Sequence, residues 1–169
     1  MLATGSEKAL AVGIGEMAVG TSAGDLLVAY GLGSCVGVAF WDPTARVGGM
    51  AHIMLPDSAT SRQAVSPGRF ADTAVPALLA SVARQGAARS RLVVKLAGGA
   101  QILAIGGTDG VLAIGQKNIS ATREALRRLG LTVAAEDVGG RCGRTVRLYL
   151  DTGRVVVQAV GQTPRELGR

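Results

Sequence analysis

The sequence has few of the residues on which several common functions depend. Aromatic residues make up only 3% of its 169 positions, and it has two cysteines, Cys35 and Cys142, and one histidine, His52. Two cysteines are too few for a secreted disulfide framework, and one histidine with two distant cysteines does not supply the roughly four ligands of a zinc site. Scarce aromatics argue against a base-stacking surface. We therefore expect neither a metal or other cofactor nor a nucleic-acid partner.

Long hydrophobic runs are also missing. No apolar stretch approaches the ~18 residues needed to span a bilayer. The first residues include Glu7 and Lys8 and lack the basic-then-apolar design of a signal peptide. We therefore expect a cytoplasmic protein with no membrane insertion. The net charge of +6 is spread along the chain, and it suits an acidic protein partner.

The length and the apolar content predict one folded domain over residues 1–169. Hydrophobic residues make up 48% of the chain and the mean hydropathy is +0.34, which is enough to bury a core. Short apolar runs bounded by glycine predict strands at residues 12–19, 25–30, 36–41, 46–55, 91–97, 111–115, 131–137, 144–150 and 154–160. The predicted class is mixed α/β (α+β), with layered, mostly antiparallel or mixed sheets flanked by two main helices.

Two segments carry apolar residues at helical spacing. The first helix is predicted near residues 68–85, where Pro76 bends or delays it, and Gly86 follows as a stop. The second is predicted over about residues 119–129, with Asn118 as its N-terminal cap.

A predicted hairpin brings the one histidine near a cysteine. The turn Asp42-Pro43-Thr44-Ala45 lies between two strands and favours a type I turn. With Trp41 opposite Arg46, Cys35 lies directly opposite His52, on the same face of the sheet, with Cβ atoms about 4.5–5.5 Å apart. A shift of one residue would place the two side chains on opposite faces.

A cysteine or histidine taken alone is more often a buried core residue, but together they form a nucleophile and its base. A thiol with a pKa near ~8.5 is mostly protonated at neutral pH, and a neighbouring imidazole can take its proton. Backbone N–H groups near Ser34 and Cys35 could stabilise an oxyanion, and Gly31 and Gly33 leave little bulk over the thiol. These residues predict acyl transfer without specifying the substrate.

Six segments of the sequence carry a family resemblance. They are GLGSCVGV at 31–38, GGMAHIMLPDS at 48–58, GRFADTAV at 68–75, LAGGAQIL at 96–103, IGQKNI at 114–119 and AEDVGGRCGRTV at 135–146. In this order they resemble the CheD family of chemoreceptor glutamine deamidases. The resemblance implies that Cys35 is the nucleophile and His52 the base, and that glutamines of methyl-accepting chemotaxis receptors become glutamates with release of ammonia. It also implies binding to a CheC-type phosphatase of CheY and a fold like that of the cytotoxic necrotizing factor toxins.

One departure from the family pattern concerns the group that orients the imidazole. The pattern has a threonine six residues before the cysteine, where this chain has Ala29. A backbone carbonyl or another polar side chain must then orient His52, and Ser34 and Thr73 are candidates. Gly98 and Gly99 shape either a partner or substrate surface or a strand-end turn, and Cys142 is expected to be structural or incidental.

Two alternative functions stay open at this point. The first is a binding module that regulates a CheC-type phosphatase with weak or no catalysis. The second is a Cys/His enzyme that acts on small amides or thioesters.

Overall fold

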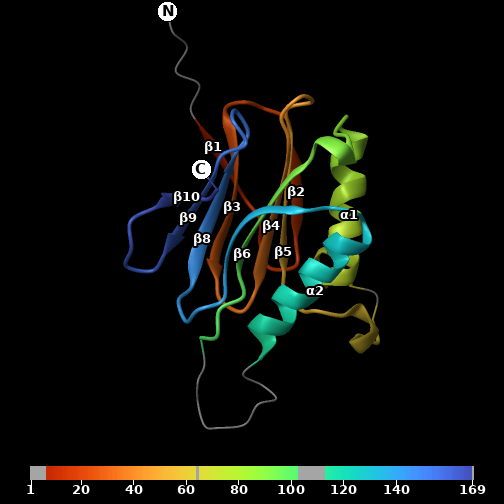
Figure 1. The fold of residues 1–169 in the computed structure, drawn as a ribbon, viewed down its shortest axis with the longest axis vertical. Helices are drawn as coiled ribbons and strands as arrows, with labels where there is room; N and C mark the ends of the chain where they lie inside the picture. The colour runs from red at the N-terminus through yellow and green to blue at the C-terminus, as the bar shows by residue number, and fades with distance from the viewer. Residues whose placement is uncertain (1–6, 64, 103–112, 169) are drawn as a thin grey trace, which may run out of the picture.

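The fold has three layers. The computed structural model describes residues 7–63, 65–102 and 113–168. Two five-stranded sheets lie face to face, and the helices α1 (Ala71–Arg84) and α2 (Ile114–Arg128) cover the outer face of the second sheet (Figure 1). This arrangement confirms the mixed class with two main helices. The likeness to the cytotoxic necrotizing factor toxins stays a prediction.

Each sheet mixes antiparallel and parallel pairs. The first sheet has the order β1 (Lys8–Ala11), β3 (Asp25–Leu32), β8 (Arg144–Tyr149), β9 (Val155–Ala159) and β10 (Arg165–Glu166). The second has the order β2 (Met17–Gly20), β5 (Val47–Ile53), β4 (Val36–Asp42), β6 (Val93–Gly98) and β7 (Val133–Val138). Only the β1–β3 and β6–β7 pairs are parallel among the described strands.

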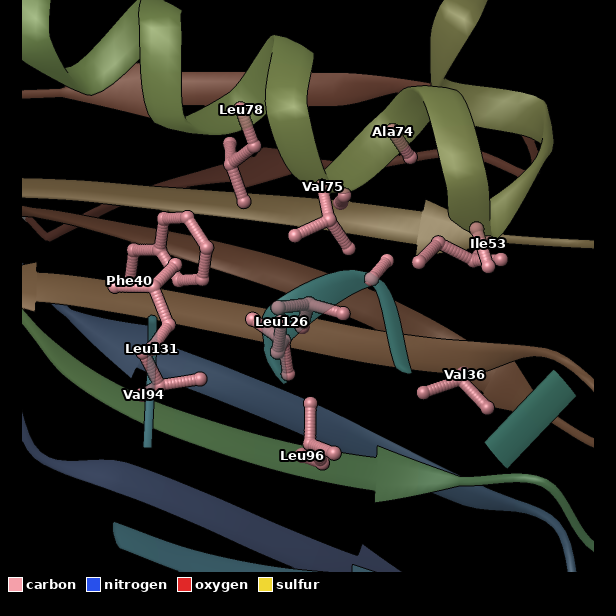
Figure 2. Packing of buried hydrophobic residues seen from close by; sticks show 14 of the residues in the cluster. Val36, Phe40, Ile53, Ala74, Val75, Leu78, Val94, Leu96, Leu126 and Leu131 are labelled. Atoms are coloured by element: carbon pink, nitrogen blue, oxygen red, sulfur yellow. The ribbon is translucent and has the colours of Figure 1, made fainter. Parts of the chain in front are cut away.

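The central strand β4 separates two hydrophobic cores. All of its residues are buried, because helices cover one face and the first sheet covers the other. Val36, Val38 and Phe40 belong to the core beneath the helices. Figure 2 shows Val36 and Phe40 among side chains of α1 and α2. Ala39 and Trp41 belong to the core between the two sheets, because alternate residues of a strand point to opposite faces.

Several predicted elements have different bounds. The strand expected at 12–19 begins only at Met17, since residues 12–16 form a loop against β5. Of the strand expected at 111–115, residues 111–112 lie outside the described residues, and 114–115 belong to α2. This helix begins before Asn118, so the predicted cap is wrong. Helix α1 begins at Ala71 and includes Pro76 in its second turn. No helix in the described ranges has the length and apolarity to cross a bilayer.

Candidate active site

The hairpin register differs from the predicted one by two residues. His52 lies opposite Gly37, and Asp42 closes the turn opposite Val47, so the expected direct pairing of Cys35 with His52 is wrong. The loop comprises residues 43–46, because the Asp42 carboxylate accepts hydrogen bonds from the N–H groups of Thr44 and Ala45. Its carbonyl also accepts from Arg46, which has a φ of +56°.

The two-residue shift keeps both side chains on one face of the second sheet. Side chains alternate with a period of two along a strand, so Cys35 lies on the same side as Gly37, diagonally across from His52. The packing agrees, because Cys35 and Met50, two residues before His52, both belong to the core between the sheets. Diagonal neighbours are typically about 7–8 Å apart, within reach of a long or ring side chain.

A backbone carbonyl orients the imidazole. His52 is 2% exposed, and its Nδ1 lies 3.0 Å from the carbonyl oxygen of Val12. A carbonyl only accepts hydrogen bonds, so Nδ1 carries the proton and Nε2 of the neutral ring is a free base. The Nε2 atom is buried and has no hydrogen-bond partner among the described residues.

This carbonyl replaces the side chain that Ala29 lacks. Val12 follows β1 and is tied to β3 through its N–H, which donates to Val28 at 2.8 Å. Neither of the two side chains proposed for the role bonds the imidazole in the described residues. The Thr73 hydroxyl donates to Pro67 at 2.6 Å on the helix side of the sheet. The hydrogen bond recorded for Ser34 is to its backbone carbonyl.

The backbone before β4 is held by its carbonyl groups. Gly33 accepts from the N–H of Ala100 at 2.8 Å, and Cys35 accepts from the N–H of Gly99 at 2.7 Å. Ser34 accepts from the side chain of Asn118 at 2.9 Å. The N–H groups of Ser34 and Cys35 donate to no residue that the structure describes. Consecutive free N–H groups beside a thiol are the donors that an oxyanion requires.

Gly98 and Gly99 let β6 approach the cysteine. Both have positive φ, of +108° and +69°. A Cβ at Gly98 would lie 2.3 Å from the Cys35 carbonyl oxygen. The buried guanidinium of Arg144 bonds the carbonyl of Gly98 at 3.4 Å, and it also bonds the backbone and side chain of Asp137. Of the two alternatives for the glycines, a strand-end turn describes them better, and this turn supports the site.

Burial favours the neutral forms of both groups. It raises the pKa of the Cys35 thiol, whose residue is 9% exposed. Burial also lowers the pKa of His52, against the smaller opposite effects of the Val12 hydrogen bond and the charge of Glu16. At neutral pH the resting site therefore holds a thiol and a neutral imidazole rather than an ion pair.

Two supporting residues escaped the sequence analysis. Asn118 was expected to cap a helix, and Arg144 was part of a strand pattern, but both are buried and bond backbone carbonyls near Cys35. A buried polar residue must find partners, but the sequence analysis did not place either residue in a core, so it had no signal for these contacts. The carbonyl of Val12 leaves no such signal, because every residue has one.

Other features are not part of the Cys35 and His52 pair. A groove of about 750 Å³ runs between α1 and α2, lined by charged residues such as Asp72, Lys117 and Glu124, and neither Cys35 nor His52 lines it. Cys142 is an exposed free thiol. Within the described ranges no group of three or more metal-ligating side chains occurs, and the expected lack of a cofactor stays a prediction.

Comparison with known proteins identifies relatives along most of the chain. A family model described as "CheD chemotactic sensory transduction" matches residues 54–159, starting just after His52. A protein of Symbiobacterium thermophilum named "Probable chemoreceptor glutamine deamidase CheD" is 48% identical over 93% of this chain and 96% of its own. Proteins of the same name from Caldanaerobacter subterraneus and Pyrococcus horikoshii are each 42% identical, over 91% and 90% of this chain and 94% and 93% of their own.

Among solved structures, the Bacillus licheniformis protein YfiH aligns with a TM-score of 0.41 at 13% identity, over 73% of this chain and 49% of its own.

Proposed function

The chain belongs to the CheD family, and we propose that it deamidates glutamine side chains of chemoreceptors, with Cys35 as nucleophile and His52 as general base. The relatives carry the name of this activity over nearly the full length. The observation that supports the site most directly is the Val12 carbonyl, which leaves the Nε2 of His52 unprotonated on the face that Cys35 shares. An acceptor at that position is what a buried thiol needs.

In the proposed first step, the thiol gives its proton to Nε2 of His52 as sulfur bonds to the amide carbon of glutamine. The N–H groups of Ser34 and Cys35 bind the oxygen that becomes negative. The C–N bond then breaks, the nitrogen takes the proton from His52 and leaves as ammonia, and a thioester stays on Cys35.

Water completes the reaction. His52 takes a proton from water as its oxygen attacks the thioester carbon. The C–S bond breaks, the sulfur recovers the proton from His52, and glutamate is released. Because the resting pair is neutral, each proton transfer occurs during the reaction and not before it. No hydrogen bond joins Nε2 to the sulfur in the free protein, and catalytic contacts of this kind often tighten only when substrate binds.

Co-expression with a chemoreceptor tests the proposal. The receptor is purified and digested, and mass spectrometry looks for glutamines that have become glutamates. Wild type should produce them. Cys35→Ala should produce none while circular dichroism shows that it is folded, and Cys142→Ala, which removes the exposed thiol, should retain full activity. Deamidation by Cys35→Ala at the wild-type rate would refute the assigned nucleophile.

Free glutamine and short glutamine peptides distinguish this proposal from the small-amide alternative. A protein deamidase should act on the intact receptor helices and leave the small amides almost unchanged. Preferential turnover of the small amides would favour the alternative.

We also propose a CheC-type phosphatase as partner and the cytoplasm as location. The partner rests on the family, and the location is consistent with two free thiols, which persist in reducing compartments. Binding to a purified CheC-type protein should be measured for wild type and Cys35→Ala. Equal affinities would support a docking role independent of catalysis, and no binding by wild type would remove this partner.

A further inference from the structure

We propose that Asn118 is a positioning residue of the active site, which holds the peptide group between Ser34 and Cys35 so that the Cys35 N–H faces the reacting carbonyl oxygen. The inference rests on the proposed deamidation, because it concerns the oxyanion of that reaction. Asn118 does not touch the substrate in this account. It acts through the backbone next to the nucleophile.

The contacts of Asn118 join the two catalytic strands. Asn118 lies within α2 and is fully buried. Its Nδ2 donates to the carbonyl of Ser34 and to the carbonyl of Met54, both at 2.9 Å. Ser34 directly precedes Cys35, and Met54 follows His52 by two residues. One amide group therefore ties the start of β4 to the end of β5.

This bridge stands where the sheet ladder ends. The last paired residues at this end of the hairpin are Val36 and Ile53. Beyond them the N–H of Met54 turns away and donates to Arg69 at 3.0 Å. The carbonyls of Ser34 and Met54 would then face each other without a donor, and the two hydrogens of the Asn118 amide satisfy both of them.

The orientation of the Asn118 amide follows from these partners. The opposite orientation would place Oδ1 against two carbonyl oxygens, which only accept hydrogen bonds. With Nδ2 on the carbonyls, Oδ1 is buried and has no partner among the described residues. An unsatisfied buried acceptor is unfavourable by about 1–3 kcal/mol. This unfavourable contribution accompanies an Nδ2 group whose two hydrogens bond the carbonyls of Ser34 and Met54.

The bond to Ser34 also determines where the Cys35 N–H points. A trans peptide group is planar and carries its C=O and N–H on opposite sides. Holding the Ser34 carbonyl toward Asn118 therefore directs the Cys35 N–H away from α2. This N–H has no partner in the described part of the chain, so the amide of Asn118 preorganises a free donor beside the thiol. Preorganised donors of this type contribute most when charge develops on the substrate oxygen.

Substitution of Asn118 tests the inference against a matched control. Asn118→Ala removes both donors. Thr122→Ala truncates a fully buried residue one turn further along α2, whose hydroxyl has no partner among the described residues. Both variants are made with Cys142→Ser, so that Cys35 is the only thiol. Asn118→Ser, which loses less volume, replaces Asn118→Ala if that variant does not fold.

Two rates are measured for each variant. The first is deamidation of a receptor fragment, resolved into kcat and KM. The second is alkylation of Cys35 by iodoacetamide, followed by mass spectrometry. Alkylation forms no oxyanion, so it does not depend on the direction of the Cys35 N–H. A general loss of structure at the cysteine would change both rates together.

We expect Asn118→Ala to lower kcat by roughly 10–100-fold, less than or equal to the loss of a whole oxyanion donor. KM and the alkylation rate should stay within about twofold, and Thr122→Ala should retain the wild-type kcat. If Asn118→Ala keeps the wild-type kcat, or if its two rates change in parallel, the inference is overturned while the deamidase proposal stands. If wild type itself shows no turnover, the proposed function fails, and this inference fails with it.

Discussion

Replacing Gly98 by alanine tests whether the end of β6 holds Cys35 in the position that the proposed catalysis requires. Gly98 has a φ of +108°, and a Cβ there would lie 2.3 Å from the carbonyl oxygen of Cys35. The neighbouring Gly99 donates its N–H to the same oxygen at 2.7 Å. The Cβ and the oxygen must separate in Gly98→Ala, and we therefore expect both stability and activity to fall.

The expected loss of stability in Gly98→Ala has two parts. A positive φ is unfavourable for a residue with a Cβ by roughly 1–2 kcal/mol. A contact at 2.3 Å must lengthen by on the order of 1 Å to reach van der Waals distance. That movement weakens the Gly99 hydrogen bond, which contributes about 1 kcal/mol. Together they predict a loss of about 2–3 kcal/mol, or roughly 4–12 °C in Tm for a chain of this size.

Gly86 provides the matched control. Its φ is +102°, and a Cβ there would meet nothing within 4 Å. Gly86→Ala should therefore lose only the stability that the positive φ accounts for, about 1–2 kcal/mol, and it should retain full activity. Urea unfolding measures the stability of each variant, and ammonia release from a receptor fragment measures kcat. The kcat of Gly98→Ala should fall at least about tenfold, because displacements near 1 Å affect catalysis strongly. Equal stability and activity of the two variants would refute the reasoning.

Three further predictions concern the histidine, the paired titrations and the hairpin turn. Since His52 is the only histidine, the nitrogen NMR signals of a labelled imidazole need no assignment. The spectrum should show Nδ1 protonated and Nε2 unprotonated at neutral pH. A spectrum of the opposite tautomer would contradict the Val12 hydrogen bond. The free energy of unfolding should decrease below the ordinary His52 pKa of 6.5, because the unfolded chain then binds a proton that the folded state disfavours. It should also decrease above the ordinary Cys35 pKa of 9.0, because the unfolded chain then loses a proton that the folded state retains. The alkaline decrease should be smaller in Cys35→Ala, and identical alkaline curves for the two proteins would show that burial does not raise the thiol pKa. Asp42→Asn should lower the free energy of unfolding by about 1–3 kcal/mol in urea unfolding. The reason is that the buried Asp42 carboxylate bonds Arg91 and three backbone N–H groups, which an amide satisfies only in part. Glu124→Gln at an exposed ion pair should unfold like wild type, and equal midpoints for these two variants would contradict the role of Asp42.

Local patterns in the sequence were sufficient to predict the main elements. The Asp-Pro turn and the apolar runs on either side predicted the hairpin, and the helical spacing of apolar residues predicted α1 and most of α2. Such patterns could not place the turn to within one residue. Asp42 was placed inside the loop, whereas the structure has it as the last residue of β4, because its carboxylate also accepts from Ala88 and Arg91. Those partners lie 46 and 49 residues further along the chain.

The predicted shared face of Cys35 and His52 is correct despite this error because of parity. A shift by two residues moves every partner along the strand and leaves each side chain on its own face, so Cys35 and His52 still share a face of the sheet. A shift by one residue would have separated them.

By itself the sequence determined which residue types can carry the chemistry and which face of the hairpin they share, because strand periodicity is a local property of the chain. Only the tertiary structure decided which groups hold them. The Val12 carbonyl that orients His52 and the Asn118 amide that holds Ser34 lie 40 and 84 residues from their partners. Contacts between residues so far apart in the chain depend on how the sheets and helices pack. The role of a backbone carbonyl also cannot be read from the sequence, because it does not depend on the residue type.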